Sequence, residues 1–190
     1  MAKVYEFLAD GFEDIEALAP VDVLRRGGVD IQTVSTTGTR TVTSAHGVAL
    51  QADLTIEEAD LSQASLLLLP GGMPGAQNLL EHDGVTSALL AHARQGRLIG
   101  AICAAPMVLG HLGLLRGRRA TCYPGFESHL EGAEYTAQLV TVDGPFITAE
   151  GPAASLEYAY TLLTILRDVE TTLPIRRGMM YEHLMLARHD

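Results

Sequence analysis

Two short apolar segments constrain the fold of this chain more than any other feature. Residues 65–69 and 98–102 are continuous runs of apolar and small residues, and each is followed by a turn of small residues and a later helical pattern. Runs of this kind are typical of strands at the centre of a parallel sheet, where helices cover both faces. The alternation of strands and helices predicts a doubly wound α/β domain with a mostly parallel sheet.

The remaining pattern fits the same plan. It predicts strands at 3–9, 29–35 and 118–123, hairpins at 41–51 and 139–148, and helices at 14–26, 83–95, 106–112 and 153–167. The first helix carries one apolar stripe, formed by Ile15, Leu18, Val21 and Leu24. We expect a single domain over residues 1–190, with a C-terminal helical segment (173–190) that docks on its body or on a second subunit.

Composition excludes several classes of function. The net charge of −10 argues against nucleic acid or an anionic membrane surface as a partner, because both need clustered Lys and Arg. Two cysteines, Cys103 and Cys122, are too few for a disulfide scaffold, and no Cys-x-x-Cys or His-rich spacing predicts a metal site. No apolar run approaches the ~18 residues of a membrane span, and no signal-peptide pattern opens the chain. A reducing cytoplasm is the expected location.

Cys103 lies on the turn that follows the strand at 98–102. This strand-to-helix turn matches an elbow on which a nucleophile is held in a strained conformation, with Ala101 and Ala105 as small neighbours. Unpaired N–H groups at a helix start would lower the pKa of the thiol from about 8.5 and could hold an oxyanion. The alternative is an inert core thiol, because free Cys is among the most buried residue types. The residues of this stretch leave both interpretations open.

Several strand ends should meet at one edge of the sheet. Glu16 lies in the first turn after the first strand, Gly71 and Gly72 follow the strand at 65–69, and Tyr123 could end a fourth strand near Cys103. In open α/β sheets this carboxyl edge is where ligands bind. Glu16 could instead be a helix N-terminal acid that complements the dipole, and the glycine pair a tight strand exit. The convergence with Cys103 favours a site.

Five segments carry a resemblance to a known family: residues 11–16 (GFEDIE), 69–78 (LPGGMPGAQN), 101–106 (AICAAP), 121–124 (TCYP) and 151–153 (GPA). In this order they resemble the ThiJ/PfpI superfamily and, within it, the DJ-one (parkinsonism-associated deglycase) branch, over roughly residues 3–167. The resemblance implies a flavodoxin-like domain, usually a homodimer, that requires no metal and no organic cofactor.

The resemblance also assigns roles to single residues. Cys103 matches the family nucleophile and redox-sensing thiol, and Glu16 matches the glutamate that hydrogen-bonds the sulfur. Gly72 and Ala104 match positions whose N–H groups form an oxyanion pocket. Arg26 matches an arginine that relatives lend to the neighbouring subunit's site.

Tyr123 departs from the family pattern, because several relatives carry a histidine there. A Cys–His dyad at that place is excluded, which argues against a peptidase, and whether the Tyr123 hydroxyl replaces the histidine stays open. The leading hypothesis is a cysteine-dependent, glutathione-independent glyoxalase or deglycase acting on methylglyoxal-type α-oxoaldehydes or their protein adducts. The alternative is an oxidative-stress sensor or chaperone-like protein that works through oxidation of Cys103. A role in thiamine (thiazole phosphate) biosynthesis, named for relatives, is disfavoured because no phosphate-binding P-loop is present.

Overall fold

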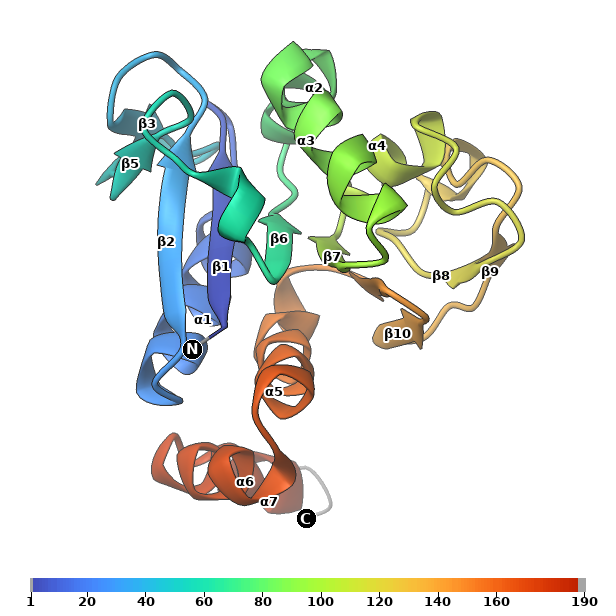
Figure 1. Cartoon of the computed structure of the whole chain (residues 1–190). Coiled ribbons are helices and arrows are strands. Elements are labelled where there is room, and N and C mark those ends of the chain that lie inside the picture. The colour runs from blue at the N-terminus through green and yellow to red at the C-terminus, as the bar shows by residue number, and fades with distance from the viewer. Residues whose placement is uncertain (1, 188–190) are drawn as a thin grey trace.

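The computed structural model describes residues 2–187, and a seven-stranded sheet forms its centre (Figure 1). The strand order is β10-β11-β7-β6-β1-β2-β5, and every pair is parallel except β10 with β11. The strands are β1 Lys3–Leu8, β2 Asp30–Ser35, β5 Leu54–Thr55, β6 Leu66–Leu69, β7 Leu98–Ile102, β10 Val140–Asp143 and β11 Phe146–Ala149. The predicted α/β class with a mostly parallel sheet is confirmed.

Helices cover both faces of this sheet. They are α1 Asp14–Arg26, α2 Gly75–Glu81, α3 Asp83–Arg94, α4 Pro106–His111, α5 Ser155–Leu166, α6 Val169–Gly178 and α7 Tyr181–Ala187. Helices α1 and α5 pack against each other, and Figure 1 shows α2, α3 and α4 grouped on the side of β6 and β7 away from α5. Within residues 2–187, no helix combines the length and the apolarity needed to cross a bilayer.

The two apolar segments form the middle of the sheet, as predicted. The four leucines of β6 are each at most 1% exposed, and β6 pairs with β1 on one side and β7 on the other. Burial of a leucine side chain contributes roughly 1.5–3 kcal/mol, so these central strands supply much of the stability of the core. Their carboxyl ends therefore present the following loops from a rigid base.

The apolar stripe predicted on α1 is only half buried. Val21 and Leu24 lie in the core, but Ile15 is 56% exposed and Leu18 is 42% exposed. The prediction was wrong for these two residues because Glu16, which is fully buried, occupies the sheet-facing side at this end of the helix. An apolar surface therefore remains open on the first half of α1.

The strand predicted at 118–123 is much shorter and lies elsewhere. Only β8 Arg119–Ala120 forms, and it pairs with β9 Glu134–Tyr135 in a separate two-stranded sheet. The N–H of Thr121 donates to the hydroxyl of Thr148 (2.9 Å) and not to a strand ladder, which ends β8. Tyr123 is therefore not the end of a strand of the central sheet. The hairpin at 41–51 forms as β3 Thr41–Thr43 and β4 Ala49–Gln51, also outside that sheet.

The C-terminal segment begins earlier than predicted and is divided. Helix α6 starts at Val169, where the Asp168 side chain accepts the N–H of Thr171 (2.6 Å) as a helix cap. The chain then turns at Met180, whose φ of 60° is left-handed, and α7 follows. Residues 188–190 of the predicted segment lie outside the described residues. Helix α2 and strand β5 had no clear sequence signal.

Candidate active site at a cysteine elbow

Cys103 occupies a strained turn directly after β7. Its φ of 65° lies in the left-handed region, which non-glycine residues adopt at a cost of about 1–3 kcal/mol. Two backbone hydrogen bonds fix the turn: the N–H of Cys103 donates to the carbonyl of Ala149 (2.9 Å), and its carbonyl accepts the N–H of Tyr123 (2.9 Å). The neighbours Ala101 and Ala105 are completely buried. The structure therefore has the elbow that the sequence predicts.

Glu16 brings a buried carboxyl group to this turn. The Glu13 side chain caps α1 by accepting the N–H of Glu16 (2.8 Å), and Oε2 of Glu16 accepts the N–H of Gly71 (2.8 Å). Burial raises the pKa of Glu16 to about 7, and the charge of Glu13 adds to this, while interactions with Cys103 and Gly71 oppose it. Within residues 2–187, Oε1 of Glu16 has no hydrogen-bond partner of ordinary geometry, and the Cys103 thiol is the side chain whose interaction lowers the pKa of this carboxyl group.

The glycine loop after β6 lets these groups approach each other. A Cβ on Gly71 would lie 2.6 Å from Oε2 of Glu16 and 2.7 Å from Cβ of Cys103, so no side chain fits there. The carbonyl of Gly71 also accepts the N–H of Glu13 (3.0 Å), which ties the loop to the start of α1. Gly72 has a φ of 84°, a conformation that glycine adopts without strain.

The sulfur of Cys103 meets two backbone donors and one acid. The nearby N–H groups of Gly72 and Ala104 lower its pKa, but burial and the neighbouring Glu16 carboxylate raise that pKa by more. The predicted lowering of the thiol pKa is therefore wrong in its net direction. The reason is that the thiol is only 9% exposed and that α4 begins three residues later, at Pro106.

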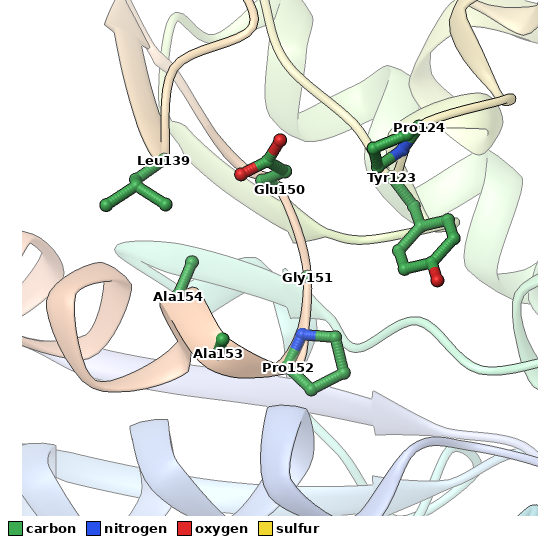
Figure 2. A pocket seen from close by; sticks show the side chains of 8 residues that line it. All are labelled: Tyr123, Pro124, Leu139, Glu150, Gly151, Pro152, Ala153 and Ala154. Atoms are coloured by element: carbon green, nitrogen blue, oxygen red, sulfur yellow. The ribbon is translucent and has the colours of Figure 1, made fainter.

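Tyr123 bonds to the elbow through its backbone N–H and not through its side chain. Its side chain is 46% exposed, and within residues 2–187 its hydroxyl makes no hydrogen bond to Cys103 or Glu16. It forms one wall of a cavity of about 200 Å³ (Figure 2). This cavity is lined by Tyr123, Pro124, Leu139, Glu150, Gly151, Pro152, Ala153 and Ala154. Sequence reasoning missed the cavity, because its walls come from three segments far apart in the chain.

Arg26 does not reach the elbow within this chain. Its guanidinium pairs with Asp22 (3.0 Å) at the far end of α1, and both side chains are about half exposed. Its assignment to a partner's site stays a prediction. Cys122 is completely buried and is not bonded to Cys103.

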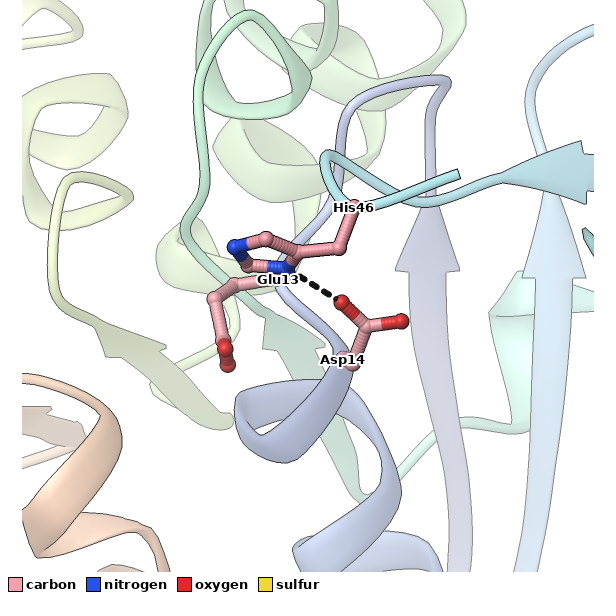
Figure 3. Close-up of side chains that lie close together, drawn as sticks. All are labelled: Glu13, Asp14 and His46. Carbon is pink, nitrogen blue, oxygen red and sulfur yellow. Dashed lines mark hydrogen bonds and ion pairs between the residues drawn. The ribbon is translucent and has the colours of Figure 1, made fainter. Parts of the chain in front are cut away.

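A second polar group lies at the start of α1 (Figure 3). Nδ1 of His46 is 2.6 Å from Oδ2 of Asp14, and this hydrogen bond raises the pKa of His46. With Glu13, these side chains offer ligand atoms within 4.8 Å of one another, so they could hold a metal ion. The sequence predicts no metal ligands and gives no signal for this group, because His46 lies 32 residues from Asp14.

Together these features define a class: a flavodoxin-like α/β domain with a cysteine on a strained elbow, a buried carboxyl group beside it and backbone donors on its sulfur. The comparison with protein families agrees with this class. Residues 2–165 match the DJ-1/PfpI family, and the chain belongs to that family.

Individual relatives give the same result. Protein DJ-1 homolog B of Arabidopsis thaliana is 35% identical over 91% of this chain, although the chain spans only 40% of that protein's length. Deglycase PH1704 of Pyrococcus horikoshii is 31% identical over 80% of this chain and 91% of its own. The structure of oxidized Toxoplasma gondii DJ-1 superposes with a TM-score of 0.91 at 33% identity, over 95% of this chain and 98% of that one.

Proposed function

We propose that this protein is a cysteine-dependent, glutathione-independent enzyme that acts on methylglyoxal-type α-oxoaldehydes or on their protein adducts. The observation that supports it most is the contact of the Cys103 thiol with the buried Glu16 carboxyl group, with the N–H groups of Gly72 and Ala104 on the same sulfur. The name of the Pyrococcus relative, a deglycase, points to the same chemistry.

The first step is addition of sulfur to the aldehyde carbon. Burial and the carboxylate raise the pKa of Cys103, so the thiol gives its proton to Glu16 as the sulfur–carbon bond forms. The aldehyde oxygen then takes that proton, and a hemithioacetal results. In this proposal the N–H groups of Gly72 and Ala104 stabilise negative charge on this oxygen.

The second step moves a proton between adjacent carbons. Glu16 removes the proton from the carbon bonded to sulfur and returns one to the neighbouring carbonyl carbon, which converts the hemithioacetal into a thioester of a 2-hydroxy acid. Water then breaks the carbon–sulfur bond and releases lactate and the free thiol. A carboxyl group with a pKa of about 7 can hold or release a proton at neutral pH, as this step requires.

The test is lactate formation from methylglyoxal without glutathione, using metal-free protein. We expect turnover in the wild type and its loss in Cys103→Ala and in Glu16→Gln. Cys122→Ala is the matched control, because it removes the other buried thiol and should keep activity. Full turnover in Cys103→Ala would contradict the proposal.

Oxidation of Cys103 is the second candidate function. The superposed Toxoplasma protein is described as oxidized, and a sulfinic acid at Cys103 would meet the donors of Gly72 and Ala104. Mild peroxide treatment should add the mass of two oxygens at Cys103, and Glu16→Gln should change the dose required. An unchanged dose in that variant counts against a sensor that relies on Glu16.

We infer that the protein forms a homodimer through α1. Ile15 and Leu18 form an exposed apolar surface on the first half of that helix, and together with Ala19 they line a pocket there. Leu18→Glu should then yield a monomer in light scattering, whereas Leu186→Glu, an exposed leucine on α7, should not. A wild-type monomer contradicts the inference.

A further inference from the structure

Another cavity, of about 470 Å³, lies at the amino edge of the central sheet. Its walls include Gly96, which precedes β7, and Pro145, which precedes β11, together with the end of α3 and the turn after α4. The volume falls within the roughly 300–1,000 Å³ typical of small-molecule sites. Cys103 follows the other end of β7, whose five residues span roughly 16 Å. The cavity is therefore separate from the elbow.

This region concentrates positive charge in an acidic chain. Residues 84–126 contain five of the 13 Lys and Arg residues and no Asp or Glu, although the whole chain has a net charge of −10. Arg94 and Arg118 line the cavity. Arg116 approaches the Gly113 wall, since a Cβ on Gly113 would lie 3.6 Å from Nε of Arg116. A local excess of positive charge at a cavity attracts anions.

Arg118 is held in place at the cavity wall. Its Nη1 donates to Oδ1 of Asp143 (3.2 Å), and its guanidinium carbon lies 6.0 Å from the centre of the Phe146 ring. Gly144 leaves room for the guanidinium, because a Cβ there would lie 2.9 Å from Nη1. A cation that is already held in this way loses little conformational freedom when an anion binds.

Arg94 adds a positive charge that has no carboxylate partner. Within residues 2–187, its side chain takes part in none of the ion pairs that the structure shows. Its place in the last turn of α3 complements the helix dipole, but the dipole does not satisfy the guanidinium donors. Because Asp143 balances only Arg118, the cavity keeps one net positive charge from its lining arginines.

The remaining walls are largely apolar. Leu90, Leu114 and Pro145 are half-buried, and Phe146 is only 5% exposed. These walls suit the apolar body of a ligand, while a guanidinium matches the two oxygens of a carboxylate. A ligand with one negative charge and an apolar body therefore fits this cavity better than a small hydrated anion, which would leave the apolar walls uncovered.

We propose that this cavity binds a monocarboxylate with an aromatic or branched apolar body, with Arg94 and Arg118 on the carboxylate and the apolar walls around the body. The site requires no reaction at Cys103. It therefore goes beyond the proposed function and can be tested without any measurement of turnover.

An NMR titration with three probes tests the charge and the apolar body separately. Phenylacetate and the uncharged phenylacetamide have nearly the same shape, and acetate carries the charge without the ring. We expect phenylacetate to bind wild type at least about 10-fold more tightly than either of the others and to shift the amide signals of Gly96 and Gly113. Arg94→Gln should remove the preference for phenylacetate over phenylacetamide. Arg177→Gln, an exposed arginine on α6 outside the cavity lining, is the matched control and should preserve it.

Four results would overturn the proposal. Equal affinities of wild type for phenylacetate and phenylacetamide, or binding of neither, contradict recognition of the carboxylate. Equal affinities for phenylacetate and acetate contradict a role of the apolar walls. An unchanged preference in Arg94→Gln excludes the arginine as the partner of the carboxylate. Signal shifts at Gly72 and Ala104, without shifts at Gly96 and Gly113, place the carboxylate at the elbow instead.

Discussion

The protonation of Glu16 makes a quantitative prediction about stability. Burial raises the pKa of this carboxyl group from 4.5 to about 7 in the folded protein. The folded state then keeps a proton that the unfolded state releases, so stability is greatest below pH 4.5 and falls as the pH rises towards 7. Linkage gives a loss of about 3 kcal/mol between pH 4 and pH 8 from this group. Glu16→Gln removes that loss, because the amide does not titrate and can still accept the N–H of Gly71.

Urea unfolding of wild type and Glu16→Gln from pH 4 to pH 8 provides the measurement. The difference in free energy of unfolding, variant minus wild type, should increase by about 3 kcal/mol from pH 4 to pH 8. The other titrating groups act in both proteins and cancel in this difference. Glu134→Gln, an exposed carboxyl group on β9, is the control and should show no comparable gain. A difference between wild type and Glu16→Gln that stays within about 0.5 kcal/mol at all pH values would refute the reasoning.

Three further predictions concern neighbouring groups. Gly71→Ala should lose about 1–3 kcal/mol of stability in urea and abolish lactate formation, because its Cβ would overlap Glu16 and Cys103; wild-type values would contradict the packing. Glu6 is completely buried in β1, and burial raises its pKa well above the usual range. Glu6→Leu should therefore be stabilised relative to wild type more at pH 8 than at pH 4 in thermal unfolding. The same pH profile in both proteins would oppose this. Asp14→Asn should lower the pKa of His46 in an NMR titration, and no change would exclude the hydrogen bond seen in Figure 3.

Much of the fold and the meeting of the site residues could be predicted, because both follow from local patterns. The apolar runs of β6 and β7 specify central strands, and parallel strands bring their carboxyl ends to one edge. Once that edge is defined, Gly71 and Cys103 must lie near each other, and the first turn of α1 adds Glu16. The strained φ of Cys103 agrees with the small residues around it.

The properties that could not be predicted from the sequence depend on how deeply side chains are buried and on segments far away in the chain. The direction of the pKa change of Cys103 depends on how deeply the thiol is buried and on how closely Glu16 approaches it. The spacing of residues in the sequence predicts neither. Ile15 and Leu18 are exposed because Glu16 occupies the sheet-facing side of α1 at this end, and a helical stripe cannot reveal that. The place of Glu150 in a cavity depends on Leu139 and other residues outside its own loop.

Glu16 and Cys103 are best treated as one titrating pair. The pair shares one proton in two alternative states. In the first state the proton is on the sulfur and Glu16 is charged; in the second the proton is on Glu16 and the sulfur is charged. The N–H of Gly71 favours charge on Glu16, whereas the N–H groups of Gly72 and Ala104 favour charge on the sulfur. Addition of sulfur to a carbonyl requires only that this one proton cross between the two groups. The backbone donors thus favour charge on either member of the pair, and the proton transfer of the proposed reaction requires both states.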